Sequence, residues 1–84
     1  MARYRRKAPK KLGGKIREVR LHLEMTQEQV ADYLGTDSGA ISRYERGLRE
    51  PSLLEILAFS RMSGIEMEVL IDDTLDIRLH ERRR

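Results

Sequence analysis

Apolar residues repeat along much of the chain at the spacing of helix faces. The first such face, at intervals of four, three and four residues, is formed by Leu12, Ile16, Val19 and Leu23. It predicts a helix over residues 12–23. Two glycines in its first turns, Gly13 and Gly14, are poor helix formers, each costing up to about 1 kcal/mol relative to alanine.

A second helix is predicted to begin at Thr26 and to end near Leu34. The Thr26 side chain can accept a hydrogen bond from the Gln29 amide while the Gln29 side chain reaches back, an arrangement known as a capping box. Gly35 can take the positive φ that closes the helix. A third helix is predicted over residues 37–46, because an aspartate offers its cap and a glycine its stop.

The same start signal occurs again before a fourth helix. Ser52 and Glu55 form a second capping box, and Gly64 ends a helix that is expected to run to about Ser63. The residues expected on its buried face are Leu53, Ile56, Leu57 and Ser60. A short fifth helix is predicted over residues 66–71. Its inward side chains are expected to be Val69 and Leu70.

The pattern changes after residue 72. Leu75, Ile77 and Leu79 alternate with polar residues, which is the periodicity of a strand. A lone strand has no partner in this chain, so the segment either pairs with its copy in a second subunit or lies as an ordered tail on the surface. The domain prediction is therefore a basic arm at 1–11, a helical domain at 12–72 and a C-terminal tail at 73–84.

Length and composition narrow the class of protein. A chain of 84 residues is expected to form one domain with a modest core, and the absence of cysteine removes disulfides and thiol chemistry. No apolar run approaches the roughly 20 residues that span a bilayer, and no signal peptide is evident, so a soluble, cytoplasmic protein is expected. No metal, cofactor or small-molecule ligand is expected.

The net charge of +3 hides a strong segregation of charge. Residues 1–11 carry six bases and no acid, residues 12–74 have a net charge of −5, and residues 75–84 have a net charge of +2. Basic ends around an acidic middle suggest flexible arms that reach for a polyanion, most simply nucleic acid. Charge alone supports a merely solubilising role for these ends equally well.

The second and third helices are separated by only two residues, Gly35 and Thr36. Such a short linker forces the helices to cross steeply, and the small side chain of Ala31 suits a close crossing. This is the arrangement of a helix-turn-helix, in which the second helix of the pair lies in the DNA major groove. Alanine and glycine at these places also occur in other small helical bundles, so spacing alone leaves that alternative open.

Several of these motifs together resemble a known family. The stretches that carry the resemblance are Ile16-Arg17, Met25-Thr26-Gln27-Glu28-Gln29-Val30-Ala31, Leu34-Gly35, Ile41-Ser42-Arg43-Tyr44-Glu45-Arg46-Gly47 and Pro51-Ser52-Leu53. They are similar to the Xre family of bacterial and phage repressors, over roughly residues 12–72. The resemblance implies an all-α, five-helix, lambda-repressor-like domain of a transcriptional regulator, which binds double-stranded DNA and usually acts as a homodimer.

The resemblance also implies roles for three residues outside the third helix. Gln27 matches a glutamine that grips a DNA phosphate, which agrees with an amide side chain beside the exposed amides of a helix N-terminus. Completing the helix start is its alternative role. Arg20 and Glu45 match a partly buried ion pair that ties the first helix to the third, with a phosphate contact by Arg20 as a secondary role.

In the third helix, the residues expected to face DNA bases are Ser38, Gly39, Ser42 and Arg43. Arg43 is the main candidate, because a guanidinium matches the O6 and N7 acceptors of guanine; a phosphate contact is its alternative. Ser38 and Gly39 are smaller than the amide side chains common at the matching family positions, and Ser42 suits either a base or a phosphate. The residues expected at phosphates are Arg46 and Arg49 after the third helix and Arg3, Arg5 and Arg6 in the arm, although cations at 46 and 49 also suit a helix dipole.

An enzyme is not expected, because no serine has a histidine nearby in the sequence. The alternative function is a protein-interaction adaptor of the same fold, such as an antitoxin or a partner-bridging coactivator. DNA binding predicts a cationic face made by Arg17, Arg20, Arg43, Arg46 and Arg49. The adaptor would instead be favoured by acids spread over the surface of the third helix, the candidates being Glu28, Asp32 and Glu55.

Overall fold

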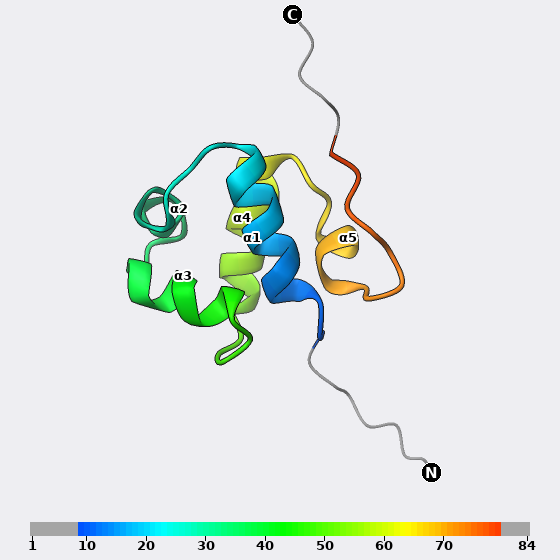
Figure 1. Cartoon of the computed structure of the whole chain (residues 1–84), viewed down its shortest axis with the longest axis horizontal. Helices are drawn as coiled ribbons and strands as arrows, with labels where there is room; N and C mark the ends of the chain where they lie inside the picture. Colours follow the sequence, from blue (N-terminus) through cyan, green and yellow to red (C-terminus); the bar gives the residue numbers. More distant parts are fainter. Residues whose placement is uncertain (1–8, 80–84) are drawn as a thin grey trace, which may run out of the picture.

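The computed structural model describes residues 9–79, which form five helices and no strand (Figure 1). The helices are α1 (Leu12–His22), α2 (Gln27–Leu34), α3 (Ser38–Glu45), α4 (Leu53–Ser63) and α5 (Met67–Ile71). Each lies within one residue of the range predicted for it, and the prediction of an all-α fold is confirmed. The predictions made for residues 1–8 and 80–84 lie outside the described residues.

Side-chain caps fix where two of the helices begin. Thr26 Oγ1 accepts from the Gln29 amide at 3.0 Å, and Gln29 Oε1 accepts from the Thr26 amide at 2.8 Å. Ser52 and Glu55 repeat the same pair of bonds at the start of α4, at 3.1 and 2.8 Å. Both predicted capping boxes are therefore confirmed. The glycines that close α2 and α4 with φ of +76° and +79° are Gly35 and Gly64.

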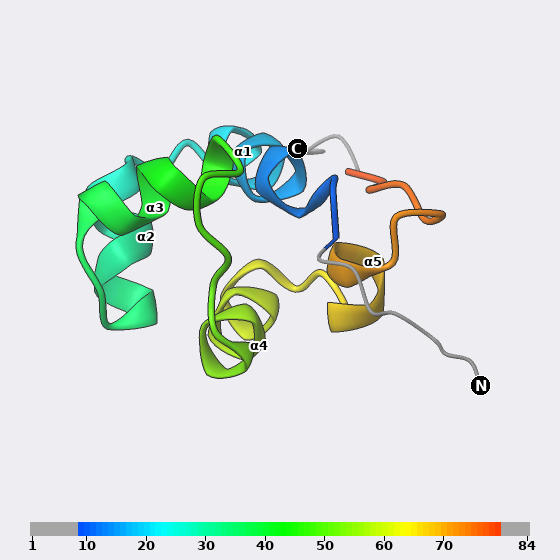
Figure 2. The same cartoon turned by 90° about the horizontal axis from the view of Figure 1, so that it is seen from below.

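The core is assembled from all five helices. α1 packs against α3 and α5, while α4 packs against α2 and α5, so α1 lies in the middle of the molecule (Figure 1). Seen from below, α2 and α3 lie at one end and α5 at the other (Figure 2). The largest side chains that are fully buried are Phe59, Ile16, Ile41, Leu70, Val19 and Val30. Leu70 confirms the inward face predicted for α5, where Val69 is half-buried.

The buried face of α4 differs from the prediction. Leu53 is 69% exposed, whereas Ile56 and Phe59 are the buried residues of the helix, and Leu57 and Ser60 are half-buried. α4 is apolar on most of its circumference, so the sequence pattern does not distinguish one face from its neighbour. The helix begins at Leu53, directly after the capping serine, and its first turn stands outside the core.

α1 and α3 approach each other closely at Gly13. A Cβ atom on this residue would lie 2.3 Å from the carbonyl oxygen of Tyr44 and 2.9 Å from that of Glu45. Real Cβ atoms do not come so near to backbone atoms, so only glycine fits here. The neighbouring Gly14 faces open space, with no atom within 4 Å of its would-be Cβ. The glycine that weakens α1 in isolation is therefore the one that lets α1 pack onto α3.

The segment after α5 forms no strand in the residues up to 79. The side chains of Ile77 and Leu79 instead pack against the core of their own chain. Their alternation with exposed residues, Asp76 and Arg78, reflects one side lying on the domain and the other in solvent. Within one chain, residues 73–79 therefore lie as an ordered segment on the domain, and pairing with a copy in a second subunit stays a prediction.

Candidate nucleic-acid interface

A tight turn joins α2 to α3. Gly35 adopts φ of +76°, and the amide of Thr36 donates to the carbonyl of Ala31 at 3.0 Å. Asp37 then caps α3, its Oδ1 accepting from the amide of Ala40 at 2.8 Å. Ala31 and Ala40 are both 1% exposed, so small side chains occupy the place where the two helices meet. The steep crossing predicted from the short linker thus has its local causes in one glycine, one cap and two alanines.

α3 divides cleanly into an inner and an outer side. Its buried residues are Ala40, Ile41 and Tyr44. The four residues predicted to contact bases lie on the other side: Ser38, Gly39 and Arg43 are exposed, and Ser42 is half-buried. The structure therefore brings the predicted base-contacting residues together on one surface, and none of them is acidic.

The guanidinium of Arg43 lies beside Gly39, one turn back toward the start of α3. A Cβ on Gly39 would lie 3.4 Å from Nη1 of Arg43 and 3.2 Å from Oδ1 of Asp37. The first distance is an ordinary van der Waals contact, whereas the second is tighter than most real contacts of a Cβ atom. The missing side chain at position 39 thus leaves room for the Arg43 head group along the outer face of α3.

A polar network ties α3 to α1 and to the start of α2. Glu45 accepts from Arg20 through both oxygens, at 2.6 Å from Nε and 3.1 Å from Nη2. The side chains of Arg20 and Glu45 are only 10% and 3% exposed. Nη1 of Arg20 donates to the carbonyl of Met25 at 2.9 Å, and Nε2 of Gln27 donates to Oε1 of Glu45 at 3.1 Å. Three helices are thus joined at a single carboxylate, and the only acid within α3 is paired.

This network determines how Gln27 and Arg20 are presented. Gln27 is half-exposed at the first position of α2, and one hydrogen of its amide nitrogen is engaged with Glu45. Its second hydrogen and its oxygen remain for an outside partner. Arg20 is 8% exposed and faces inward, so it does not belong to the cationic face on which the sequence placed it. A phosphate contact by Arg20 stays a prediction, and the buried side chain offers little surface for it.

The end of α3 carries two exposed cations. Nε of Arg46 folds back to the carbonyl and hydroxyl oxygens of Ser42, at 3.3 and 3.2 Å. The guanidinium carbon of Arg49 lies 5.8 Å from the centroid of the Tyr44 ring, within the range of a cation–π contact. Arg17 and Arg43 are exposed as well, and a single cationic face made by these four residues stays a prediction.

Glu55, one of the acids whose presence on the surface of the third helix would favour the adaptor, contacts α3 directly. The hydroxyl of Tyr44 donates to Oε1 of Glu55 at 2.8 Å, an oxygen that also accepts from the Ser52 amide. Burial, and then the bond to Glu55, raise the pKa of Tyr44 above its ordinary value. Glu55 is half-buried and bound to groups of the domain, so it is held against the inner side of α3 and not on the outer face. Sequence reasoning did not foresee this contact.

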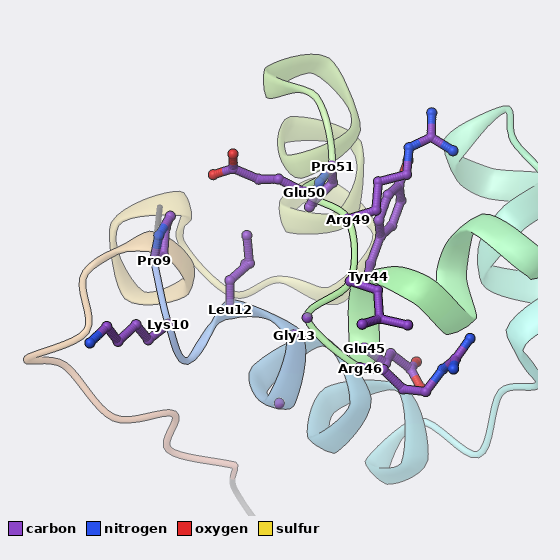
Figure 3. Close-up of a pocket in the computed structure, with 13 residues that line it drawn as sticks. Pro9, Lys10, Leu12, Gly13, Tyr44, Glu45, Arg46, Arg49, Glu50 and Pro51 are labelled. Atoms are coloured by element: carbon purple, nitrogen blue, oxygen red, sulfur yellow. The ribbon is translucent and has the colours of Figure 1, made fainter. Parts of the chain in front are cut away.

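A hollow of about 330 Å³ lies beside the end of α3 (Figure 3). It is lined by residues 44–51 on one side and, on the other, by Pro9, Lys10, Leu12, Gly13 and Gly14. Residues 9 and 10, which lead into α1, therefore lie across this hollow from the cations that follow α3. Within residues 9–79, no helix has the length and apolar character to cross a membrane, and no cluster of three metal-ligating side chains occurs.

A short helix, a glycine turn and a second helix with one exposed polar face define a helix-turn-helix protein. Residues 16–70 match the family model described as helix-turn-helix, and the chain belongs to this family. Its fold is of the Xre, lambda-repressor-like type. The family and the fold are those of DNA-binding transcriptional regulators, not of enzymes.

Three proteins illustrate the similarity. The P22 c2 repressor, solved in complex with the synthetic operator 9T, has a TM-score of 0.70 and 29% identity, over 74% of this chain and 94% of that one. The restriction-modification controller protein C.AhdI from Aeromonas hydrophila has a TM-score of 0.66 and 34% identity, over 73% and 92%. The transcriptional repressor RstR of cryptic phage CTXphi from Vibrio cholerae is 28% identical over 60 residues. Those residues are 71% of this chain and 54% of RstR, so the chain spans about half the length of that relative.

Proposed function

We propose that this protein binds double-stranded DNA sequence-specifically, with α3 in the major groove, and thereby regulates transcription. The observation that carries the proposal is the composition of the outer face of α3, where an exposed arginine stands among small polar residues while the helix's one acid is paired inside. Such a face can enter a groove lined by phosphates without like-charge repulsion. The operator complex of the similar P22 c2 repressor supports the same use of this fold.

Each surface residue then has a distinct role. Arg43 reads a base, most simply guanine, and Ser38, Gly39 and Ser42 line the approach to the base edges. The residues assigned to phosphates are Gln27, Arg46, Arg49 and the arm's Arg3, Arg5 and Arg6. Arg20 acts mainly through its ion pair with Glu45. As a homodimer, two copies of α3 about 34 Å apart would reach successive major grooves on one side of the duplex.

The decisive experiment is selection of bound sites from a random duplex pool, followed by titration of a selected duplex at 50 and 200 mM salt. We expect a defined sequence in two half-sites whose centres are one helical turn apart, and an affinity that falls steeply with salt. A single half-site would contradict the homodimer. Absent or salt-insensitive binding would overturn the proposal and favour the protein-interaction adaptor.

Replacing Arg43 by alanine is expected to weaken binding to the selected duplex by about 5- to 150-fold, which corresponds to about 1–3 kcal/mol for one bidentate base contact. Discrimination at one base pair should be lost together with the affinity. The measurement is a fluorescence anisotropy titration against the selected site and against single-base variants of it.

The matched control for this variant is Arg78→Ala. Arg78 is exposed and belongs to the tail, which lies beside α5 on the other side of the molecule from α3 (Figure 1). The Arg78→Ala variant loses the same charge as Arg43→Ala, and its base preference should be unaltered. A uniform loss of affinity across all duplexes in Arg43→Ala would instead assign Arg43 to a phosphate.

Deletion of residues 1–8 removes four cations, which are Arg3, Arg5, Arg6 and Lys7. We expect weaker binding and a flatter salt dependence with the same preferred sequence. The slope of log K against log salt should decrease by about 0.9 for each phosphate that the arm contacts, hence by up to about 3.6. Alanine at the four positions should reproduce the deletion, and an unchanged slope in both variants would refute a DNA-binding arm.

A further inference from the structure

The chain enters α1 through a contact with a residue far along the sequence. The amides of Lys10 and Lys11 both donate to the carboxylate of Asp73, at 2.8 Å to Oδ2 and 3.1 Å to Oδ1. Neither amide takes part in the hydrogen bonds of α1, because both precede its first residue. The carboxylate therefore fixes the direction of the backbone at the point where the arm joins the domain. We call this pair of bonds the arm clasp.

Asp73 itself is held by a rigid turn. Lys15 of α1 is 5% exposed, and its Nζ donates to the carbonyls of Val69 at 2.6 Å and of Asp72 at 2.9 Å. The carboxylate of Asp72 accepts from the amide and the hydroxyl of Thr74, at 2.9 and 2.7 Å. Asp73 lies between Asp72 and Thr74, which make these hydrogen bonds, so its position is tied to the C-terminal end of α5 and to Lys15 in α1.

The charge state of Asp73 suits this role. Hydrogen bonds from the amides of Lys10 and Lys11 lower the pKa of its carboxyl group below the ordinary value. It is therefore ionised at neutral pH and accepts from both amides at once. Asp76, three residues later, carries the same charge but is exposed and has only a 3.9 Å contact with Nζ of Lys11.

The clasp holds residues 10 and 11 at one side of the hollow beside α3. Pro9 and Lys10 line the hollow whose opposite side carries Arg46 and Arg49 (Figure 3). From below, α3, the loop after it and the start of α1 all face the viewer (Figure 2). Pro9, the first described residue, therefore lies across this hollow from the cations that follow α3.

We propose that Asp73 is a positioning residue, which directs the basic arm onto the DNA and so determines the arm's share of the binding affinity. This inference rests on the proposed function, since it concerns the same DNA complex. It adds a link between the segment after α5 and the arm, two parts of the chain that are more than 60 residues apart in sequence.

The test combines Asp73→Ala with deletion of residues 1–8, using duplex affinity and its salt slope as readouts. The deletion retains all five helices and the core residues that they bury, and a melting curve of the shortened chain verifies its fold. In the full chain, Asp73→Ala is expected to weaken binding about 5- to 10-fold and to flatten the salt slope by about 1–2, the loss of one or two arm contacts to phosphate. In the shortened chain it should leave binding unchanged or make it slightly tighter, because an acid has been removed.

Two further variants separate positioning from charge and from folding. Asp76→Ala removes the same charge and should shift both chains equally. Asp73→Asn keeps one oxygen acceptor, so its affinity for the duplex should lie between that of Asp73→Ala and that of the unaltered chain. Amide hydrogen exchange at Lys10 and Lys11 should accelerate in Asp73→Ala, while the melting temperature verifies that the domain stays folded at the temperature of the titrations.

The outcomes distinguish the two proposals. If the unaltered chain binds the duplex and the deletion weakens binding, but Asp73→Ala has the same effect in both chains, the positioning role is refuted and the proposed function stands. If the unaltered chain does not bind a duplex at all, both are refuted. A loss confined to the full chain, with a flatter salt slope, supports the inference.

Discussion

Replacing Glu45 by alanine is expected to lower the free energy of unfolding by about 3–5 kcal/mol, the cost of leaving one partner of a buried ion pair alone. The Glu45 side chain is 3% exposed and accepts hydrogen bonds from Arg20 and Gln27. Without it, the guanidinium of Arg20 stays in the interior with only the carbonyl of Met25. The total free energy of unfolding of a domain of this size is about 5–10 kcal/mol. The midpoints of thermal and urea unfolding should therefore be far lower in the variant than in the parent.

Two companion variants test the cause. Glu45→Gln retains an oxygen acceptor but not the charge, and it should fall between the parent and the alanine variant. The double variant Arg20→Met with Glu45→Leu removes both charges and fills the space with apolar atoms, which is often neutral or stabilising at a buried pair. Recovery of most of the lost stability in the double variant would assign the effect to the unpaired charge. A loss below about 1 kcal/mol in Glu45→Ala would show that the pair behaves like an exposed one.

Gly13→Ala is expected to destabilise the domain by about 2 kcal/mol, the upper end of the overpacking cost less the gain in helix propensity. The added methyl group would meet the carbonyl oxygen of Tyr44 at 2.3 Å, a backbone atom that cannot turn away, so α1 and α3 must move apart. Overpacking of this kind typically costs about 1–3 kcal/mol and sometimes more. The gain of about 1 kcal/mol from alanine's helix propensity offsets only part of that cost. Equilibrium urea unfolding measures the net effect.

The adjacent glycine supplies the control, because Gly14 lies in the same helix and faces open space. Gly14→Ala adds the same methyl group without a collision and should stabilise the domain by about 0.5–1 kcal/mol. The midpoint of thermal unfolding should then rise by about 2–8 °C. Two neighbouring glycines are thus expected to respond in opposite directions, and equal responses would contradict the close contact between α1 and α3.

The parts of the fold that could be predicted from the sequence are those set by local chemistry. A cap needs one side chain and one amide three residues away, so Thr26 and Ser52 mark the starts of α2 and α4 without knowledge of the rest of the chain. A glycine at a helix end acts equally locally. The buried face of α4 was misassigned at Leu53, since a helix that is apolar on most sides takes its orientation from its neighbours.

The contacts that escaped prediction join residues distant in sequence. Gly13 is read locally as a weak helix former, and only the approach of α3 shows why a glycine is needed. The bonds from Asp73 to the start of α1 span more than 60 residues, and the bond from Tyr44 to Glu55 connects two helices. No periodicity in the sequence encodes such pairs.

For the candidate interface, the sequence predicted correctly which residues share the exposed side of α3, and their contacts with DNA stay a prediction. Helical spacing places Ser38, Gly39, Ser42 and Arg43 opposite Ile41 and Tyr44, and the structure has the same division. The exposure of Arg20 was misjudged, because a guanidinium at that position reaches either solvent or Glu45, and only the packing of α1 on α3 decides between them.

The carboxylate shared by α1, α2 and α3 has a consequence for how the protein would adapt to different operators. Because Glu45, the last residue of α3, is bonded to both α1 and α2, α3 has little freedom to tilt against the domain. If the distance between the two α3 helices of a dimer differs from the spacing of two half-sites, the duplex must bend or twist, or the contact between the subunits must change. On the proposed function, operators would be ranked partly by how easily their unread central base pairs deform.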